Sequence, residues 1–174
     1  AQLSRGLGDV YKRQGDIASL FLLGLSNLKI KKLYALIGGS IGGGIAWEMA
    51  AISKDITKFL VPVAADWKAN DWIIANTFLQ KRIIENSKKP LQDARIHAML
   101  TYRTPQSFEN RFGRTLNKEQ GIFNIESWLI YHGEKLQKRF QLKAYVMMNH
   151  LLSSINIERE GEIALNIIKN IKSE

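Results

Sequence analysis

Cysteine is absent from this chain of 174 residues, and its absence excludes a thiol nucleophile, a disulfide and a thiolate metal site. Long apolar runs are also absent, because Lys, Asp, Asn or Gly interrupts every hydrophobic stretch before the roughly 20 residues that cross a membrane. The N-terminus lacks the charged start, apolar stretch and cleavage site of a secretion signal. These features favour a cytoplasmic protein without a metal centre.

Acidic residues are in the minority: 25 Lys and Arg against 16 Asp and Glu leave a net charge of +9. Clustered positive charge of this size would suggest nucleic acid, whose phosphates it neutralises. Here the basic residues are spread along the chain and interleaved with acidic ones, and no recognition motif surrounds them. The sequence therefore favours solvated lysines, or an anionic small ligand, over a nucleic-acid partner.

The first fourteen residues differ in composition from the rest and show weak helical periodicity. Their tail, DVYKRQ, resembles the translation of a transposon-end adapter used to prepare DNA sequencing libraries. We therefore expect residues 1–14 to be a non-native leader, with an ordinary mobile terminus as the alternative. Such a leader would mean that the protein's own sequence starts in the middle of a longer polypeptide.

Apolar patterning from residue 15 to 69 predicts a helix followed by a strand, a helix and a second strand. Asp16 is placed to cap the first helix, whose apolar side chains recur at helical spacing and should lie on a sheet. The continuous apolar run 33–37 predicts a parallel strand covered on both faces, and residues 45–51 and 59–64 predict a helix and a second buried strand. The fold class is therefore α/β.

Helical spacing dominates from residue 70 to 156, with breaks at Pro90, Pro105, Gly113 and Gly121. The expected helices are 72–86, 91–102, 125–140 and 144–153, followed by a last helix over 160–172. No alternating strand pattern occurs in this part. We expect residues 70–156 to form a separate helical layer and residues 157–174 to lead back to the core.

Residues 38–42, GGSIG, match G-x-S-x-G, the nucleophile elbow, in which a sharp turn from strand to helix exposes a serine. Gly38 and Gly42 are expected there because a side chain at either place would collide with the reversing backbone. The turn places Ser40 at a helix N-terminus, where the backbone N–H of Ile41 would supply half of an oxyanion hole. The alternative is a glycine-rich phosphate turn, but neither the phosphate-loop nor the dinucleotide pattern fits the following residues.

Three longer strings make the motif more specific: IGGSIGGGIAWEMA (37–50), LTYRTPQSFENRFGR (100–114) and FNIESWLIYHGEKLQKRF (123–140). Together they resemble the elbow and the helical cap of homoserine O-acetyltransferases, a family with the α/β-hydrolase fold, over residues 15–156. Ile41 stands where members commonly have Met, and His132 stands where Gln is frequent. The resemblance implies a partial α/β-hydrolase core over 15–69 and a helical cap over 70–156.

The resemblance also implies a two-step transfer without a permanently bound cofactor. Ser40 would take an acetyl group from acetyl-CoA and pass it to the hydroxyl of L-homoserine, a step of methionine biosynthesis. Arg95 and Tyr102 match a pair that binds the homoserine end in this family, and a guanidinium fork suits a carboxylate. A surface salt bridge and a half-buried core tyrosine are the alternatives for these two residues. A homodimer through the caps is implied as well.

An elbow serine needs an acid and a histidine, which follow it in the chain order Ser, Asp or Glu, His. This chain contains only His97, His132 and His150, all within the expected cap, where a structural role is more frequent. We therefore expect the acid and the histidine beyond Glu174, the oxyanion loop before Gly15, and little activity from this chain alone. Succinyl transfer, serine as acceptor, a serine hydrolase and a noncatalytic helical interaction module are the alternatives.

Overall fold

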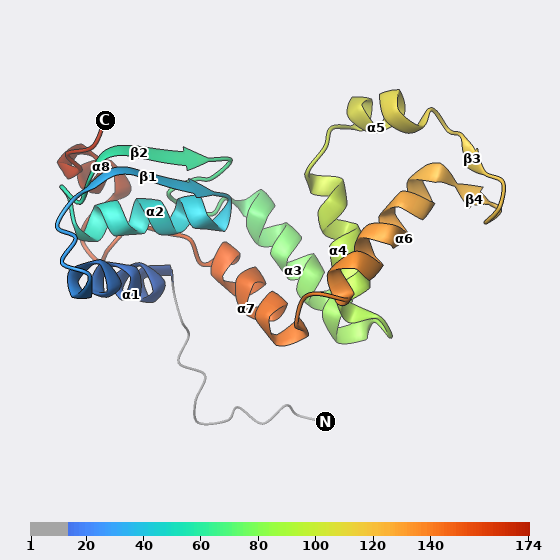
Figure 1. The fold of residues 1–174 in the computed structure, drawn as a ribbon, viewed down its shortest axis with the longest axis horizontal. Helices are drawn as coiled ribbons and strands as arrows, with labels where there is room; N and C mark the ends of the chain where they lie inside the picture. Colours follow the sequence, from blue (N-terminus) through green and yellow to red (C-terminus); the bar gives the residue numbers. More distant parts are fainter. Residues whose placement is uncertain (1–13) are drawn as a thin grey trace. The chain divides into compact units, whose positions relative to one another are not determined.

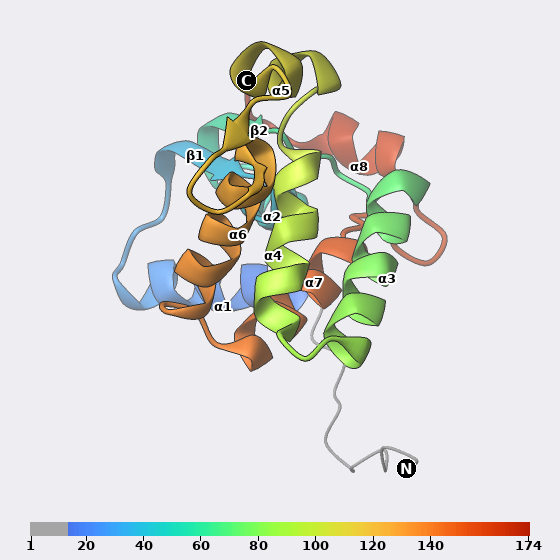
Figure 2. The ribbon, with the colours of Figure 1, turned by 90° about the vertical axis from the view of Figure 1, so that its right-hand side faces the viewer.

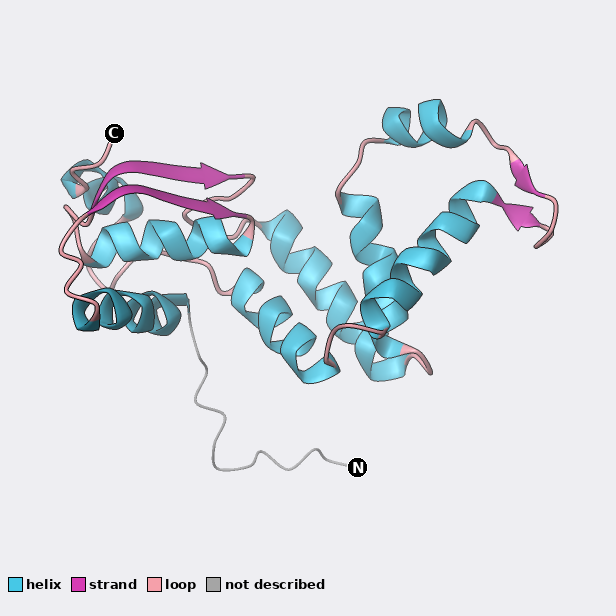
Figure 3. Cartoon of the chain, in the orientation of Figure 1, coloured by secondary structure: helices cyan, strands magenta, loops and turns pink. Residues whose placement is uncertain are grey.

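The computed structural model describes residues 14–174, which divide into two compact units. The first unit contains the described chain up to Ile73 together with Leu151–Glu174, and the second contains Ile74–His150. Figure 1 follows the chain through both by colour, and Figure 3 shows how few of its residues lie in strands. No helix in the described range is long and apolar enough to cross a membrane.

A parallel strand–helix–strand unit forms the centre of the first unit. β1 (Leu33–Gly39) is followed by α2 (Ile41–Ile52) and then by β2 (Thr57–Val63). The strands pair in parallel from Leu33 opposite Thr57 to Gly39 opposite Val63, so their carboxyl ends meet at one edge. This confirms the predicted order, although α2 begins four residues before the expected position 45.

One face of this sheet is exposed, which corrects the prediction that both faces are covered. α2 packs against both strands on the other face (Figure 1), whereas Ile37 of β1 and its register partner Val61 of β2 are 68% and 40% exposed. Successive side chains of a strand point to opposite faces, so one helical layer can cover only half of them. The apolar run predicts the strand correctly, but it does not report how many layers cover the strand.

α1 (Gln14–Asn27) packs against α2, which corrects the expected placement of this helix on the sheet. Ala18 is its fully buried residue. Its larger apolar side chains include three that are mostly exposed: Leu20, Phe21 and Leu23. Asp16 lies inside the first turn, where its charge suits the helix N-terminus, and is not the cap.

The expected leader, residues 1–14, is described only at its last residue. Gln14 is buried and donates a hydrogen bond from Nε2 to Asn156 O at 3.1 Å, so this residue is packed against the first unit. Residues 1–13 lie outside the described range.

The C-terminal part of the chain completes the first unit. Its core consists of buried Ile157, Ala164 and Ile167 packed against Trp47, Ala51 and Ile168. α8 (Ala164–Asn170) is shorter than the predicted helix 160–172, because residues 159–162 form a turn in which Gly161 has φ 77°. Residues 172–174 then run beside β2, where Glu174 N donates to Lys58 O at 2.8 Å.

A buried ion pair joins α2 to this C-terminal segment. Glu48 on α2 is only 2% exposed, and Nη2 of Arg159 donates a hydrogen bond to its Oε1. Nη1 of Arg159 also donates to Ile157 O at 2.7 Å. Burial raises the pKa of the Glu48 carboxyl above its ordinary 4.5, and the charge of Arg159 opposes that rise. The pair therefore links two segments 111 residues apart in sequence through a carboxylate that is costly to ionise.

The substitution Glu48→Gln is expected to remove a pH dependence of folding. Because the pKa of Glu48 is raised in the folded chain, that state binds more protons than the unfolded state, and its stability falls as pH rises from 4.5 through the raised pKa. In urea unfolding across this range, Glu48→Gln should lose that part of the slope, while Glu160→Gln, at an exposed position, keeps it. An unchanged profile in Glu48→Gln would contradict the raised pKa.

The second unit is helical. Its helices are α3 (Asp71–Asn86), α4 (Pro90–Thr101), α5 (Pro105–Phe112), α6 (Asn124–Gln137) and α7 (Leu142–Ser153); α3 begins and α7 ends in the first unit. α4 and α6 pack side by side (Figure 2) and approach closely at Gly133, where an added Cβ would stand 3.0 Å from Gln92 O. Four of these five helices are predicted to within three residues, because their apolar spacing is regular.

α5 and a hairpin of β3 (Leu116–Asn117) and β4 (Ile122–Phe123) are absent from the sequence prediction. The strands have two residues each, too few for an alternating pattern. Pro105 was expected to break a helix, yet it occupies the first turn of α5, a position that proline favours. Thr104 caps the helix by accepting a hydrogen bond from Ser107 N at 3.2 Å. Thr104 followed by Pro105 could therefore have been recognised in the sequence as the start of a helix.

Candidate active site

Ser40 occupies the sharp turn between β1 and α2. Its backbone angles, φ 52° and ψ −124°, lie in a region that residues with a side chain rarely adopt, at a cost of about 1–3 kcal/mol. Ser40 N donates to Val63 O at 2.9 Å, at the end of β2, and Ser40 O accepts from Gly43 N at 2.8 Å. The residue is exposed. The sheet and the helix therefore hold a strained serine at the carboxyl edge of the two strands.

The close approach of β1 to the start of α2 explains one of the two expected elbow glycines. An added Cβ at Gly38 would stand 2.7 Å from Gly43 N and nearer still to the Gly42 carbonyl. The steric reason expected for Gly42 is wrong, because an added Cβ there meets none of the described residues within 4 Å. Gly43 is crowded as well: its Cβ would overlap Ala65 and stand 2.9 Å from Gly38 O. Sequence reasoning overlooked Gly43, since its neighbour Ala65 lies beyond β2.

The N-terminus of α2 offers a hydrogen-bond donor beside Ser40. Ile41 is the first residue of the helix, and its backbone N–H finds no acceptor within residues 14–174. The first turn of α2 also contains no acidic side chain that would neutralise the positive end of the helix dipole. Negative charge that develops on an acyl oxygen bound at this turn would be stabilised by this N–H group.

The unit that carries Ser40 contains no histidine between residues 14 and 73 or in Leu151–Glu174. His97 lies on α4, His132 on α6 and His150 on α7, all within Ile74–His150. Burial lowers the pKa of His97, and it lowers that of His132 together with the nearby positive charge of Arg95. In the described range, no group of three His, Asp or Glu side chains is placed to hold a metal ion.

Arg95, in the middle of α4, and Tyr102, which caps its C-terminal end, lie on the same side of the helix, as their spacing of seven residues predicts. The guanidinium carbon of Arg95 stands 5.4 Å from the centre of the Tyr102 ring, which is exposed. Tyr145 of α7 is a third member that sequence reasoning missed. Its hydroxyl donates to Gln80 Oε1 at 2.6 Å, and burial raises its pKa to about 12, although the nearby positive charge of Arg95 opposes that rise. No local sequence pattern indicates that Tyr145 belongs to this site, because Tyr145 and Arg95 are brought together only by the packing of α7 near α4.

Comparison with known proteins identifies relatives by sequence, although no family model matches the chain. A homoserine O-acetyltransferase of Chloroherpeton thalassium is 37% identical over 161 residues, which cover 84% of this chain and 42% of the relative. A homoserine O-acetyltransferase of Cyclobacterium marinum is 33% identical over 168 residues, which cover 90% of this chain and 48% of the relative. The chain thus spans less than half the length of the curated relatives it matches.

Solved structures with a similar fold include a member of the same family. The crystal structure of homoserine O-acetyltransferase from Staphylococcus aureus superposes with a TM-score of 0.77 at 25% identity, over 93% of this chain and 47% of that one. The acetyl esterase MekB superposes with a TM-score of 0.78 at 17% identity, over 93% and 50%, and shows the fold alone.

The strained serine between a parallel strand and a helix, together with these neighbours, defines an α/β-hydrolase-fold protein, as the sequence predicts. The sequence relatives narrow this class. The chain belongs to the homoserine O-acetyltransferase family.

Proposed function

We propose that this chain carries the nucleophile and the helical cap of an acyltransferase that moves an acetyl group from acetyl-CoA to L-homoserine. In the first step Ser40 Oγ bonds to the thioester carbonyl carbon, the carbon–sulfur bond breaks, and coenzyme A leaves as a thiol with the serine proton. In the second step the homoserine hydroxyl attacks the acyl-enzyme, forms O-acetylhomoserine and returns a proton to Ser40. The strained exposed serine in a chain whose relatives have this name is the observation that carries the proposal.

Two features of the elbow support this assignment. The Ile41 N–H is proposed to donate to the acyl oxygen as it becomes negative. Gly38 allows β1 to approach α2 closely enough for the turn to form. The reaction also requires a base for Ser40. The described residues of the first unit contain no histidine, so the base is proposed to come from elsewhere in the protein.

Arg95 and Tyr102 are proposed to bind the acceptor. The Arg95 guanidinium offers a planar fork of donors for the homoserine carboxylate, and the exposed Tyr102 ring beside it can orient the same substrate. Tyr145 is proposed to position both, because its hydrogen bond to Gln80 fixes a buried phenol next to them. Acetyl-CoA is proposed as a co-substrate without a resident cofactor. A cytoplasmic homodimer that pairs through the cap is proposed from the family resemblance alone.

A hybrid protein provides the assay, because this chain matches less than half of its relatives. In the hybrid, the chain replaces the segment that it matches in the Chloroherpeton thalassium relative, which supplies the rest of its own length. Acetyl-CoA and L-homoserine together should release coenzyme A thiol and yield O-acetylhomoserine. Release of acetate at the same rate without homoserine would instead favour an ester hydrolase, and succinyl-CoA and L-serine test the other donor and acceptor.

Arg95→Ala in the hybrid should weaken the use of homoserine and spare the acetylation of the enzyme. Loss of a charge-assisted hydrogen bond costs about 1.5–3 kcal/mol, so the KM for homoserine should rise roughly 10- to 100-fold. Single-turnover acetylation by acetyl-CoA should stay unchanged. Arg139→Ala, which removes an exposed arginine after α6, is the matched control and should change neither step. Equal losses in both steps would argue that Arg95 is structural.

A further inference from the structure

The excess positive charge of the chain is confined largely to the helical unit. Ile74–His150 contains 13 Lys and Arg against six Asp and Glu, a net charge of +7. The described residues of the first unit contain nine of each and are neutral. Basic and acidic residues alternate locally, but the excess of basic ones lies in the single continuous segment that forms the helical unit. A surface with this imbalance favours an anionic ligand.

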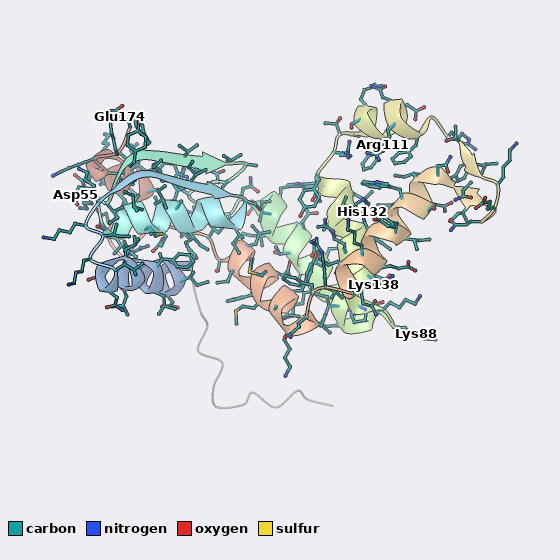
Figure 4. All side chains as sticks on the ribbon, viewed as in Figure 1. Asp55, Lys88, Arg111, His132, Lys138 and Glu174 are labelled. Atoms are coloured by element: carbon teal, nitrogen blue, oxygen red, sulfur yellow. The ribbon has the colours of Figure 1, made fainter. Side chains whose placement is uncertain are left out.

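Four of these cations converge on one place in the helical unit. Arg95 of α4, Arg103 before α5, Arg111 of α5 and Lys135 of α6 all act on His132 and lower its pKa together with burial. Figure 4 labels Arg111, one of these four cations, on the α5 side, and His132 on α6. The pKa of His132 shows no opposing effect from a carboxylate. We call these four side chains the cationic cluster.

Aromatic rings lie between the members of the cationic cluster. The guanidinium carbons of Arg103 and Arg111 stand 5.8 and 5.4 Å from the centre of the Trp128 ring, and Lys135 Nζ stands 5.6 Å from the Tyr131 ring. Tyr131 is 55% exposed. Alternation of cations and flat rings is the arrangement that binds nucleotides, because rings stack on bases while cations pair with phosphates.

A hollow of about 470 Å³ opens beside these rings. Its lining consists of Arg111, Phe112, Thr115, Asn124, Ser127, Trp128 and Tyr131, and no acidic residue is among them. Its polar groups are held in place: Asn124 Nδ2 donates to Thr115 Oγ1 at 2.9 Å, and Asn117 Nδ2 donates to Ser127 Oγ at 3.3 Å. A volume of this size matches ordinary small-ligand sites.

No carboxylate within residues 14–174 forms an ion pair with the cationic cluster. The ion pairs within residues 14–174 involve Lys68, Lys81, Arg82 and Arg159, and none involves a member of the cationic cluster. Glu126, the acidic residue nearest in sequence to Ser127 and Trp128, is already used, because its Oε2 accepts a hydrogen bond from Phe123 N at 2.7 Å. Bringing several cations together without counter-charge is unfavourable unless an anion joins them.

We infer that the hollow beside Trp128 and Tyr131 is a binding site for a phosphorylated adenine nucleotide. Arg111, with Arg103 and Lys135 beside it, pairs with the phosphates, and the exposed face of Tyr131 stacks on the base. This assignment rests on the proposed function in one respect: the nucleotide in question is the 3′-phosphoadenosine diphosphate end of acetyl-CoA. Free adenine nucleotides share the same chemistry, and an oligonucleotide is the macromolecular alternative.

Titration calorimetry with the 174-residue chain tests the inference, and Ser40→Ala as background separates binding from acylation. Coenzyme A and 3′-phosphoadenosine diphosphate should bind alike, whereas pantetheine should not bind. Arg111→Gln should weaken coenzyme A binding about tenfold or more, and Tyr131→Ala about fivefold or more. Arg139→Gln, which removes an equal charge outside the hollow, should keep wild-type affinity. Circular dichroism and melting temperature establish that each variant is folded.

Each outcome decides between the sources of the ligand. Tighter binding of coenzyme A than of ADP supports the thioester substrate, and equal binding assigns the site to free nucleotides and overturns the link to acetyl-CoA. Preference for a single-stranded oligonucleotide, equal weakening by Arg139→Gln, or pyrophosphate binding as tight as that of coenzyme A overturns the site as described. Binding without any acetylation of Ser40 in the hybrid would leave this site intact and sink the proposed function alone.

Discussion

Ser40→Ala is expected to abolish acetyl transfer in the hybrid. The hydroxyl oxygen of Ser40 is the atom that would bond to the acetyl carbon. A water molecule at the same turn would be a poor substitute for this nucleophile, so the rate of acetyl transfer should fall by about 10⁴-fold or more. Incubation with acetyl-CoA alone, followed by mass spectrometry of the peptide that contains residues 33–52, should show an added acetyl group in the parent and none in the variant. Loss of the label and loss of turnover should coincide.

Ser26→Ala is the matched control for this experiment, because Ser26 is an exposed serine of α1 in the same unit. It should keep both the label and the rate. An acetyl group that persists at the elbow peptide of Ser40→Ala would remove Ser40 from the mechanism. Retained turnover without any covalent label would point to direct transfer from thioester to hydroxyl, with the elbow serving only to bind substrate.

Gly38→Ala is expected to be the most destabilising single methyl that can be added to the elbow. The new Cβ would press on backbone atoms of Gly42 and Gly43, which cannot rotate away as a side chain can. Overpacking against backbone should cost roughly 3 kcal/mol or more, and the melting temperature should fall by about 6 °C or more. Urea unfolding of the 174-residue chain measures the change directly.

Gly42→Ala is the internal control, because it adds the same methyl four residues later where nothing described lies within 4 Å. Stability should be unchanged or slightly increased, since alanine is the better helix former by up to about 1 kcal/mol. Equal destabilisation by both substitutions would mean that α2 leaves β1 at a different angle. A neutral Gly38→Ala would mean that the turn around Ser40 relaxes at little cost.

The strain at Ser40 is maintained by contacts that are distant in sequence. The hydrogen bond from Ser40 N to Val63 O fixes the turn to the end of β2, and the crowding of Gly43 against Ala65 presses α2 toward the segment that follows β2. Farther along α2, Glu48 and Arg159 hold the helix against the C-terminal segment. Each contact is made by a segment that the G-x-S-x-G pattern does not include, so the pattern alone does not say what sustains the turn.

Local periodicity accounts for the elements that were predicted well. Parallel pairing of β1 with β2, the elbow between them and four helices of the second unit follow from apolar spacing and glycine placement, which depend on neighbouring residues. The contact of Arg95 with Tyr102 follows in the same way, because seven residues make two helical turns. The short hairpin and the length of α8 were not predicted, because elements of two to seven residues are too short to show a clear periodic pattern.

By itself, the sequence determined the α/β class, the serine at the strand-to-helix turn and the family to which the chain belongs, because each depends on short strings of residues. Tertiary structure alone decided that Gly43 and not Gly42 is crowded and that Tyr145 lies beside Arg95. These properties depend on contacts between residues far apart in the chain, and such contacts form only when packing brings the segments together.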